Sequence, residues 1–207
     1  MTLFGSAVTE TTPPLLLALH SCTDRFGIAV QDAGGIPRVA VFDDGRGLSN
    51  SLIERVDSLL PRSQWPALQG LAVATGPGGF TGTRLSVVMA RTLAQQLNCP
   101  LLGVSAFALM APRLQCREQP FWITQELPRR GVVAGQYRVE GDAVTELERP
   151  HLLSDDRVVT PARKAEVDVE ADVACLLAAL QRCLERGASL PWQGVLPIYP
   201  TSPVGPV

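Results

Sequence analysis

Residues 71–106 read LAVATGPGGFTGTRLSVVMARTLAQQLNCPLLGVSA, and the order of patterns in this stretch decides the fold class. Leu71 to Ala74 and Leu101 to Val104 are apolar runs of strand length. Between them, a glycine-rich turn leads into a helical pattern that ends near Asn98. A helix that connects two successive strands implies a parallel, right-handed crossover. The stretch therefore predicts an α/β protein.

The residues on either side extend this pattern. Further apolar runs of strand length lie at 15–19, 26–30 and 39–42. An amphipathic helix is predicted over 48–60, with Ser51 and Glu54 as a capping box, and another begins at Ala106 and is cut short by Pro112. Three meander strands followed by helix, strand, helix, strand and helix predict a mixed five-stranded sheet with flanking helices. This is the ribonuclease-H-like layout from which actin-like ATPases are built.

The second half of the chain echoes the first more weakly. Strand patterns lie at 121–124, 131–139 and 143–147, and a helical pattern lies at 171–185. We therefore expect a second, truncated lobe of the same type. The predicted division is a flexible extension at 1–13, an N-terminal domain at 14–112, a truncated C-terminal lobe at 113–190 and a Pro-rich tail at 191–207.

Composition predicts a globular protein without a broad charged surface. Hydrophobic residues make up 46% and charged residues 18%, and the formal net charge is -2. Such a balance predicts no nucleic-acid footprint larger than a local basic patch. Five scattered cysteines without a C-x-x-C pair favour reduced thiols in the cytoplasm over disulfides or a metal site. We expect no membrane segment, because the apolar runs are too short, and no secretory signal.

The glycine-rich turn at 76–84, GPGGFTGTR, allows two interpretations. Its glycines permit positive φ and close backbone approach, Thr81 could cap the following helix, and amides at a helix start can hold an anion. The lysine of a Walker A loop is missing. We favour a structural turn over a phosphate site, and Gly78, Gly79 and Thr81 are the weak candidates for binding a cofactor.

The helix after this turn has a second stripe of small residues, Ser86, Ala90 and Ala94. Small residues at this spacing let another helix come close. The stripe could meet a partner subunit, or it could pack on the chain's own helix at 48–60. Both can hold if the two helices form half of a four-helix interface.

Residues 71–106 resemble the signature of the TsaB family (YeaZ-like), in which a strand leads into G-P-G-S-F-T-G-x-R, a helix and a strand ending in G-V-S. Only Gly79 departs from that core, where the family has serine. The resemblance runs in register from Leu15 to about Pro112, and residues 196–199, LPIY, resemble the family's C-terminal L-P-x-Y. Two departures concern acidic positions: His20 replaces the usual aspartate after the first strand, and the second lobe lacks the usual acidic residue within 124–133.

The resemblance implies a non-catalytic, actin-like-fold subunit of the machinery that makes threonylcarbamoyladenosine on tRNA. Its implied partners are the catalytic TsaD-type subunit and a TsaE-type ATPase, with tRNA reached through the complex and a homodimer possible when the chain is alone. No cofactor of its own is expected, although ATP or ADP could lie at the subunit interface. The implied interface uses the helices at 48–60 and 81–97. Its candidate residues are Leu52, Val56, Leu59, Arg84, Ser86, Met89, Ala90, Leu93 and Ala94.

Two other readings remain open. A self-sufficient ATPase or transferase is disfavoured because the acidic positions are altered, the helix at 48–60 has no histidine, and no H-E-x-x-H spacing supports a glycoprotease. A diverged homodimeric binding module outside the tRNA pathway is the main alternative. Arg84, Arg113 and Arg117 could form a phosphate-facing patch, but scattered arginines are more typical of solvated surface.

Overall fold

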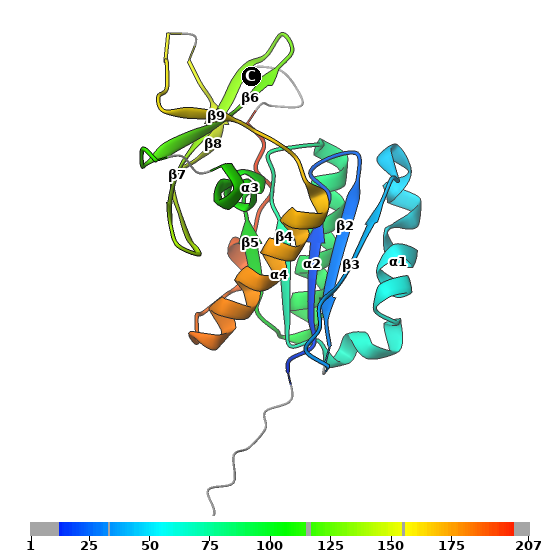
Figure 1. The fold of residues 1–207 in the computed structure, drawn as a ribbon. Coiled ribbons are helices and arrows are strands. Elements are labelled where there is room, and N and C mark those ends of the chain that lie inside the picture. Colours follow the sequence, from blue (N-terminus) through cyan, green and yellow to red (C-terminus); the bar gives the residue numbers. More distant parts are fainter. Residues whose placement is uncertain (1–12, 33, 115–116, 155, 201–207) are drawn as a thin grey trace, which may run out of the picture.

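Two mixed β-sheets organise the fold in the computed structural model, which describes residues 13–32, 34–114, 117–154 and 156–200 (Figure 1). The first sheet has the strand order β3-β2-β1-β4-β5. Its strands are β1 (Leu16–His20), β2 (Phe26–Gln31), β3 (Arg38–Phe42), β4 (Gly70–Ala74) and β5 (Leu101–Val104). β1, β2 and β3 pair antiparallel, whereas β4 is parallel to β1 and to β5. The predicted mixed five-stranded sheet is confirmed.

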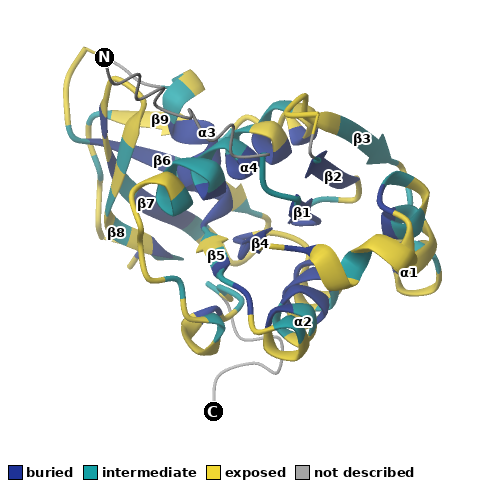
Figure 2. Ribbon diagram, turned by 90° about the horizontal axis from the view of Figure 1, so that it is seen from below, coloured by how far each residue is buried: buried dark blue, intermediate teal, exposed yellow. Residues whose placement is uncertain are grey.

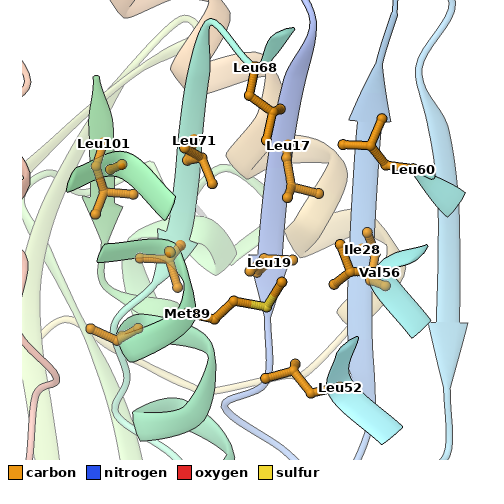
Figure 3. Packing of buried hydrophobic residues seen from close by; sticks show 14 of the residues in the cluster. Leu17, Leu19, Ile28, Leu52, Val56, Leu60, Leu68, Leu71, Met89 and Leu101 are labelled. Atoms are coloured by element: carbon orange, nitrogen blue, oxygen red, sulfur yellow. The ribbon is translucent and has the colours of Figure 1, made fainter. Parts of the chain in front are cut away.

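Helices cover both faces of this sheet (Figure 2). On one face, α1 (Leu48–Leu59) and α2 (Phe80–Leu97) pack on side chains such as Leu19, and Figure 3 shows Leu52 of α1 and Met89 of α2 reaching the same layer. On the other face, α3 (Ala106–Leu114) and α4 (Val169–Glu185) cover Leu16 and Ala18. β1 thus lies at the centre of a three-layer arrangement, buried on both faces, as its all-apolar sequence predicts.

The second sheet repeats the strand order of the first in shortened form. Its order is β8-β7-β6-β9, with β6 (Phe121–Leu127), β7 (Gly131–Glu140), β8 (Ala143–Leu152) and β9 (Ala162–Lys164). β9 is parallel to β6 just as β4 is parallel to β1. The predicted truncated lobe of the same type is therefore confirmed. β9 was not predicted, because its sequence Ala-Arg-Lys is exposed and has no apolar pattern.

The helix α4 does not sit where its position in the sequence suggests. It falls within the predicted C-terminal lobe at 113–190, but its buried residues Val173, Leu176 and Leu180 pack against the first sheet. α4 packs there because its apolar stripe fits the face of the first sheet that α1 and α2 do not cover. Whether 14–112 and 113–190 fold as separate domains stays a prediction.

Three local predictions about helix ends are wrong. α1 begins after Gly47, and the Ser51 hydroxyl donates to the Gly47 carbonyl (3.4 Å) instead of forming a capping box. α2 begins after Gly79 without a side-chain cap, so Thr81 lies inside its first turn. α3 continues past Pro112 to Leu114, because a proline near a helix end removes only one late hydrogen bond.

The described part of the Pro-rich tail crosses the end of β4. After a short 3-10 helix, η3 (Trp192–Gly194), the amide of Ile198 donates to the carbonyl of Thr75 (2.7 Å). The Tyr199 and Phe80 rings lie with their centroids 4.6 Å apart. The tail therefore joins the glycine-rich turn. The expected extension over 1–13 lies outside the described residues except for Pro13, as do residues 201–207.

Candidate functional site

The glycine-rich turn packs tightly on the segment that follows β1. A Cβ atom placed on Gly78 would lie 1.9 Å from the carbonyl oxygen of Cys22, and the amide of Gly79 donates to the same oxygen (2.8 Å). No other residue type fits at Gly78 without moving backbone. Burial raises the pKa of the neighbouring Cys22 thiol to about 11, so the thiol stays protonated. These contacts support the structural interpretation of the turn.

The start of α2 is tied to the same segment. A Cβ atom on Gly82 would lie 2.6 Å from the Ser21 carbonyl oxygen, so glycine allows close approach here too. The Ser21 hydroxyl contacts both the Gly82 carbonyl oxygen (2.8 Å) and the hydroxyl of Ser86 (2.7 Å). Ser86 is fully buried by these contacts. It therefore anchors α2 to the end of β1.

His20 ends β1 inside the protein. It is fully buried, and neither ring nitrogen has a hydrogen-bond partner among the described residues. Burial lowers its pKa from 6.5 to about 4, and the positive charge of Arg113 acts in the same direction. His20 is consequently neutral at physiological pH. An uncharged, buried imidazole does not reproduce the aspartate carboxylate that the resemblance leads one to expect there.

A buried ion pair lies on the α3–α4 side of the sheet. Arg113 donates to the carboxylate of Asp172 (2.6 Å) and to the Glu166 carbonyl (3.0 Å). Asp172 is fully buried, and its burial raises the pKa of the carboxyl while Arg113 lowers it. Arg113 is committed to this pair, so it cannot belong to the phosphate-facing patch that the sequence suggested.

A second polar cluster joins the two halves of the chain. The Ser105 hydroxyl, at the start of α3, donates to the Glu146 carboxylate (2.5 Å) and contacts the Tyr137 hydroxyl (3.1 Å). Burial raises the pKa of Tyr137 strongly, so its hydroxyl keeps its proton. Sequence reasoning missed this cluster, because its members come from three elements that only the tertiary fold brings together.

A cavity of about 320 Å³ opens between the glycine-rich turn and the second sheet. Its walls are Cys22, Thr23, Asp24, Pro77, Gly78, Gly79, Gln125, Leu127, Val133 and Pro200. Gly78 and Gly79 therefore face it, whereas Thr81 is not among its walls. Asp24 is the single ionisable carboxylate on these walls. Among the residues that the structure describes, no three His, Cys, Asp or Glu side chains gather as metal ligands would.

Most of the predicted interface residues face inward. Leu52, Val56, Ser86, Met89, Ala90 and Ala94 are buried by the chain itself, Leu59 and Leu93 are partly buried, and only Arg84 is exposed. The prediction that these six buried side chains form surface contacts is therefore wrong. The stripe of small residues is buried within the chain, where α2 contacts both the sheet and α1.

The outward face of α1 and α2 is carried by other side chains. Val88 is 54% exposed and Ile53 is 40% exposed, and both point away from the sheet. At about 100° per residue, Val88 lies on the opposite side of α2 from Ala90. Between Leu85 and Leu97 the only charged residue of α2 is Arg91, which lies over the Trp192 ring (5.7 Å) on the flank. This α1–α2 face is therefore apolar at Ile53 and Val88, with Arg84 at the start of α2 and Arg91 on its flank.

One family model matches more than half of the chain. Residues 29–173 match the family described as TsaD: tRNA N6-adenosine threonylcarbamoyltransferase. A tRNA threonylcarbamoyladenosine biosynthesis protein TsaB from Bacillus subtilis (strain 168) is 43% identical over 44 residues, which cover 21% of this chain and 19% of that protein. The match thus spans about a fifth of that relative.

Two solved structures share the fold. One is an uncharacterized protein with similarity to peptidase YeaZ from Pseudomonas aeruginosa, with a TM-score of 0.71 and 22% identity over 91% of this chain and 100% of that chain. The other is YeaZ from Pseudomonas aeruginosa, with a TM-score of 0.69 and 22% identity over 90% of this chain and 100% of that chain. No described helix is long and apolar enough to span a bilayer.

Proposed function

The chain belongs to the TsaD family of tRNA N6-adenosine threonylcarbamoyltransferases and is TsaB/YeaZ-like within it, and from this premise we propose that it is a non-catalytic partner subunit. It binds the catalytic TsaD-type subunit in the tRNA threonylcarbamoyladenosine pathway and works beside a TsaE-type ATPase. Transfer RNA is modified by the complex. The proposed compartment is the cytoplasm, in keeping with the free thiols of Cys22, Cys99, Cys175 and Cys183.

The observation that carries this proposal is the α1–α2 face. Ile53 and Val88 expose apolar side chains on adjacent helices, and Arg84, one turn before Val88, is the charged residue at the start of this stripe. Two helices packed side by side can meet two helices of a related subunit as a four-helix bundle. The interface residues are therefore proposed to be the outward ones, together with Arg84, Leu59 and Leu93 at the edge.

The end of β1 supports a non-catalytic role. A hard cation such as magnesium needs oxygen ligands, and a neutral imidazole does not supply one. His20 is buried and unpaired, and the nearby cavity offers Asp24 as its only carboxylate. No cofactor of its own is proposed for the chain, and a nucleotide at the subunit interface would have to be held mainly by the partner.

The test is complex formation with the purified TsaD-type subunit, followed by light scattering after gel filtration. We expect a stable complex at low salt and an affinity loss of about 100-fold in Val88→Asp, because an apolar interface would bury an unpaired carboxylate. Val158→Asp is the matched control, since Val158 is 91% exposed in the second half of the chain. Equal behaviour of the two variants, or no complex at all, would contradict the proposal.

A diverged homodimeric module is the second candidate, and His20 at the altered acidic position favours it. Such a protein would pair through the same α1–α2 face with a second copy of itself. Cells depleted of their own TsaB-type subunit separate the two functions: restored tRNA modification supports the partner subunit, and its absence with intact self-association supports the module.

A further inference from the structure

A cavity of about 320 Å³ lies where the two halves of the chain meet. Its walls include Leu102 of β5, Ser105 just before α3, Asp142 of the β7–β8 hairpin and Arg182 of α4, and we name it the hairpin cavity. Figure 1 shows the turn of this hairpin beside α3, on the side of the molecule where β5 is the last strand of the first sheet. The volume is at the small end of the range for ligand pockets, so it suits a molecule the size of a dipeptide.

α4 supplies the positive side of the hairpin cavity. Arg182 and Arg186 line it, one turn apart at the end of the helix. Among the described residues, no carboxylate forms an ion pair with either guanidinium group. Burial raises the pKa of the Cys175 thiol in the same wall, and the charge of Arg182 acts in the opposite direction. Arg113 and Asp172, which also act on this thiol, are paired with each other. The two guanidinium groups of α4 are therefore available to a carboxylate.

The hairpin supplies the negative side of the cavity. Glu146 accepts hydrogen bonds from the hydroxyls of Ser105 (2.5 Å) and Tyr137 (3.3 Å). Its other oxygen lies 3.3 Å from the guanidinium group of Arg149, so the charge of Glu146 is already matched. Asp142, in the turn of the hairpin, belongs to none of the ion pairs of the described residues. It is therefore the carboxylate that can meet a ligand cation.

Apolar side chains and a strand edge lie between the two charged sides. Leu102, Leu109 and Val144 line the cavity. β5 is the edge strand of the first sheet, and Gly103 is exposed on it. The outer edge of a strand offers backbone N–H and C=O groups to an extended peptide. This part of the cavity therefore suits a short peptide with apolar side chains.

We propose that the hairpin cavity binds a zwitterionic dipeptide with apolar side chains. The carboxylate of the dipeptide meets Arg182 and Arg186, its ammonium group meets Asp142, and its side chains lie on the apolar wall. A simple anion would leave Asp142 unpaired, and a simple amine would leave the two guanidinium groups unpaired. A single amino acid carries both charges on one carbon atom, whereas a dipeptide carries them at its two ends, as the two walls require.

The carboxylate contact is tested with a ligand that lacks it. In calorimetric titration of the full-length chain, leucyl-leucine should bind about tenfold or more tightly than leucyl-leucine amide, because the amide loses the charge-assisted hydrogen bonds. Arg182→Gln with Arg186→Gln should weaken leucyl-leucine by a similar factor and leave the amide unchanged. Arg46→Gln with Arg138→Gln removes the same charge from exposed arginines outside the cavity and is the matched control.

The ammonium contact is tested in the same way. Asp142→Asn keeps a side chain that suits a turn, and it should weaken leucyl-leucine by about fivefold or more. N-acetyl-leucyl-leucine has no ammonium group, so its weaker binding should be the same in the wild type and in Asp142→Asn. Glu54→Gln neutralises an exposed carboxylate of α1 and is the matched control.

A chemical footprint locates the ligand. Cys175 and Cys183 both line the hairpin cavity, so their alkylation by iodoacetamide, read by mass spectrometry, reports on its occupancy. We expect saturating leucyl-leucine to slow the alkylation of both thiols. Glycyl-glycine carries the same charges without the apolar side chains, so at the same concentration it should protect them much less.

Several results would overturn the proposal. Leucyl-leucine could fail to bind at millimolar concentration, or it could leave both alkylation rates unchanged. Equal affinity for the amide would assign the cavity to an amine, equal affinity for the N-acetyl form would assign it to an anion, and either result contradicts a zwitterion. Equal losses in the cavity variants and their controls would contradict it too. None of these measurements needs the TsaD-type subunit, so the hairpin cavity and the proposed function are tested separately.

Discussion

The buried imidazole of His20 makes stability depend on pH. In the folded chain its pKa is lowered from 6.5 to about 4, so the unfolded chain takes up a proton first as the pH falls. The stability that comes from keeping His20 neutral is fully present above pH 6.5 and is lost as the pH falls from 6.5 toward 4. At roughly 1.4 kcal/mol for each pH unit, the loss between pH 7.5 and pH 4.5 is on the order of 2 to 3 kcal/mol.

His20→Leu removes this dependence. Leucine has a similar volume and no nitrogen to desolvate, so at pH 7.5 we expect the variant to be about as stable as the wild type or slightly more stable. Urea unfolding followed by tryptophan fluorescence at pH 7.5, 6 and 4.5 gives the free energy of unfolding of both chains. The difference in free energy of unfolding between the two chains reports the contribution of His20 alone, because other groups such as Asp172 titrate in both chains.

Two results would refute this reasoning. One is a free energy of unfolding that falls equally in the wild type and in His20→Leu as the pH drops to 4.5. The other is an NMR titration in which the His20 ring takes up its proton near 6.5 instead of near 4.

Gly78→Ala should lower the free energy of unfolding by about 3 kcal/mol or more, because its Cβ would lie 1.9 Å from the Cys22 carbonyl oxygen. Gly79→Ala should lower it by less than about 1 kcal/mol, because its Cβ would lie 4.0 Å from the same atom. Equal urea midpoints for the two variants would contradict this. Arg113→Leu should destabilise by about 3 kcal/mol at pH 7.5, because it leaves the buried Asp172 carboxylate unpaired, and less at pH 5, because burial raises the pKa of this carboxyl and a lower pH moves it toward its neutral form. Asp172→Asn should destabilise the fold less than Arg113→Leu does, because the side chain of Arg113 is 31% exposed and can reach water. Thermal unfolding at pH 7.5 and pH 5 compares the stabilities of the two variants.

The first sheet was predictable because each of its strands carries its own signal. The run Leu15 to Leu19 is apolar throughout and becomes a strand buried on both faces. The glycine-rich turn at 76–84 was found for the same reason, since its residues are adjacent in sequence. Local patterns thus sufficed for the elements, their order and the sheet they form.

The side of α2 that packs on the sheet could not be predicted from the helical periodicity of its sequence. A helical pattern shows that Val88 and Ala90 lie on different sides, but it does not say which side meets the sheet. We expected the small stripe to meet a partner or the chain's own helix at 48–60, whereas Ser86, Ala90 and Ala94 are buried in the folded chain, and small residues also let a helix lie close to its own strands. Likewise, the sequence near His20 does not predict its burial. His20 lies on the same face of β1 as Leu16 and Ala18, and the helices that cover this face, α3 and α4, come from later in the chain.

The position of α4 limits how the gene can be shortened. A product that stops near Leu114 would keep all five strands of the first sheet but would lose the helix that seals one side of it. Leu16 and Ala18 would then meet solvent across an open hydrocarbon surface, which invites aggregation. A shortened protein made of the first half should therefore include α4, joined to α3 by a linker that replaces the second sheet.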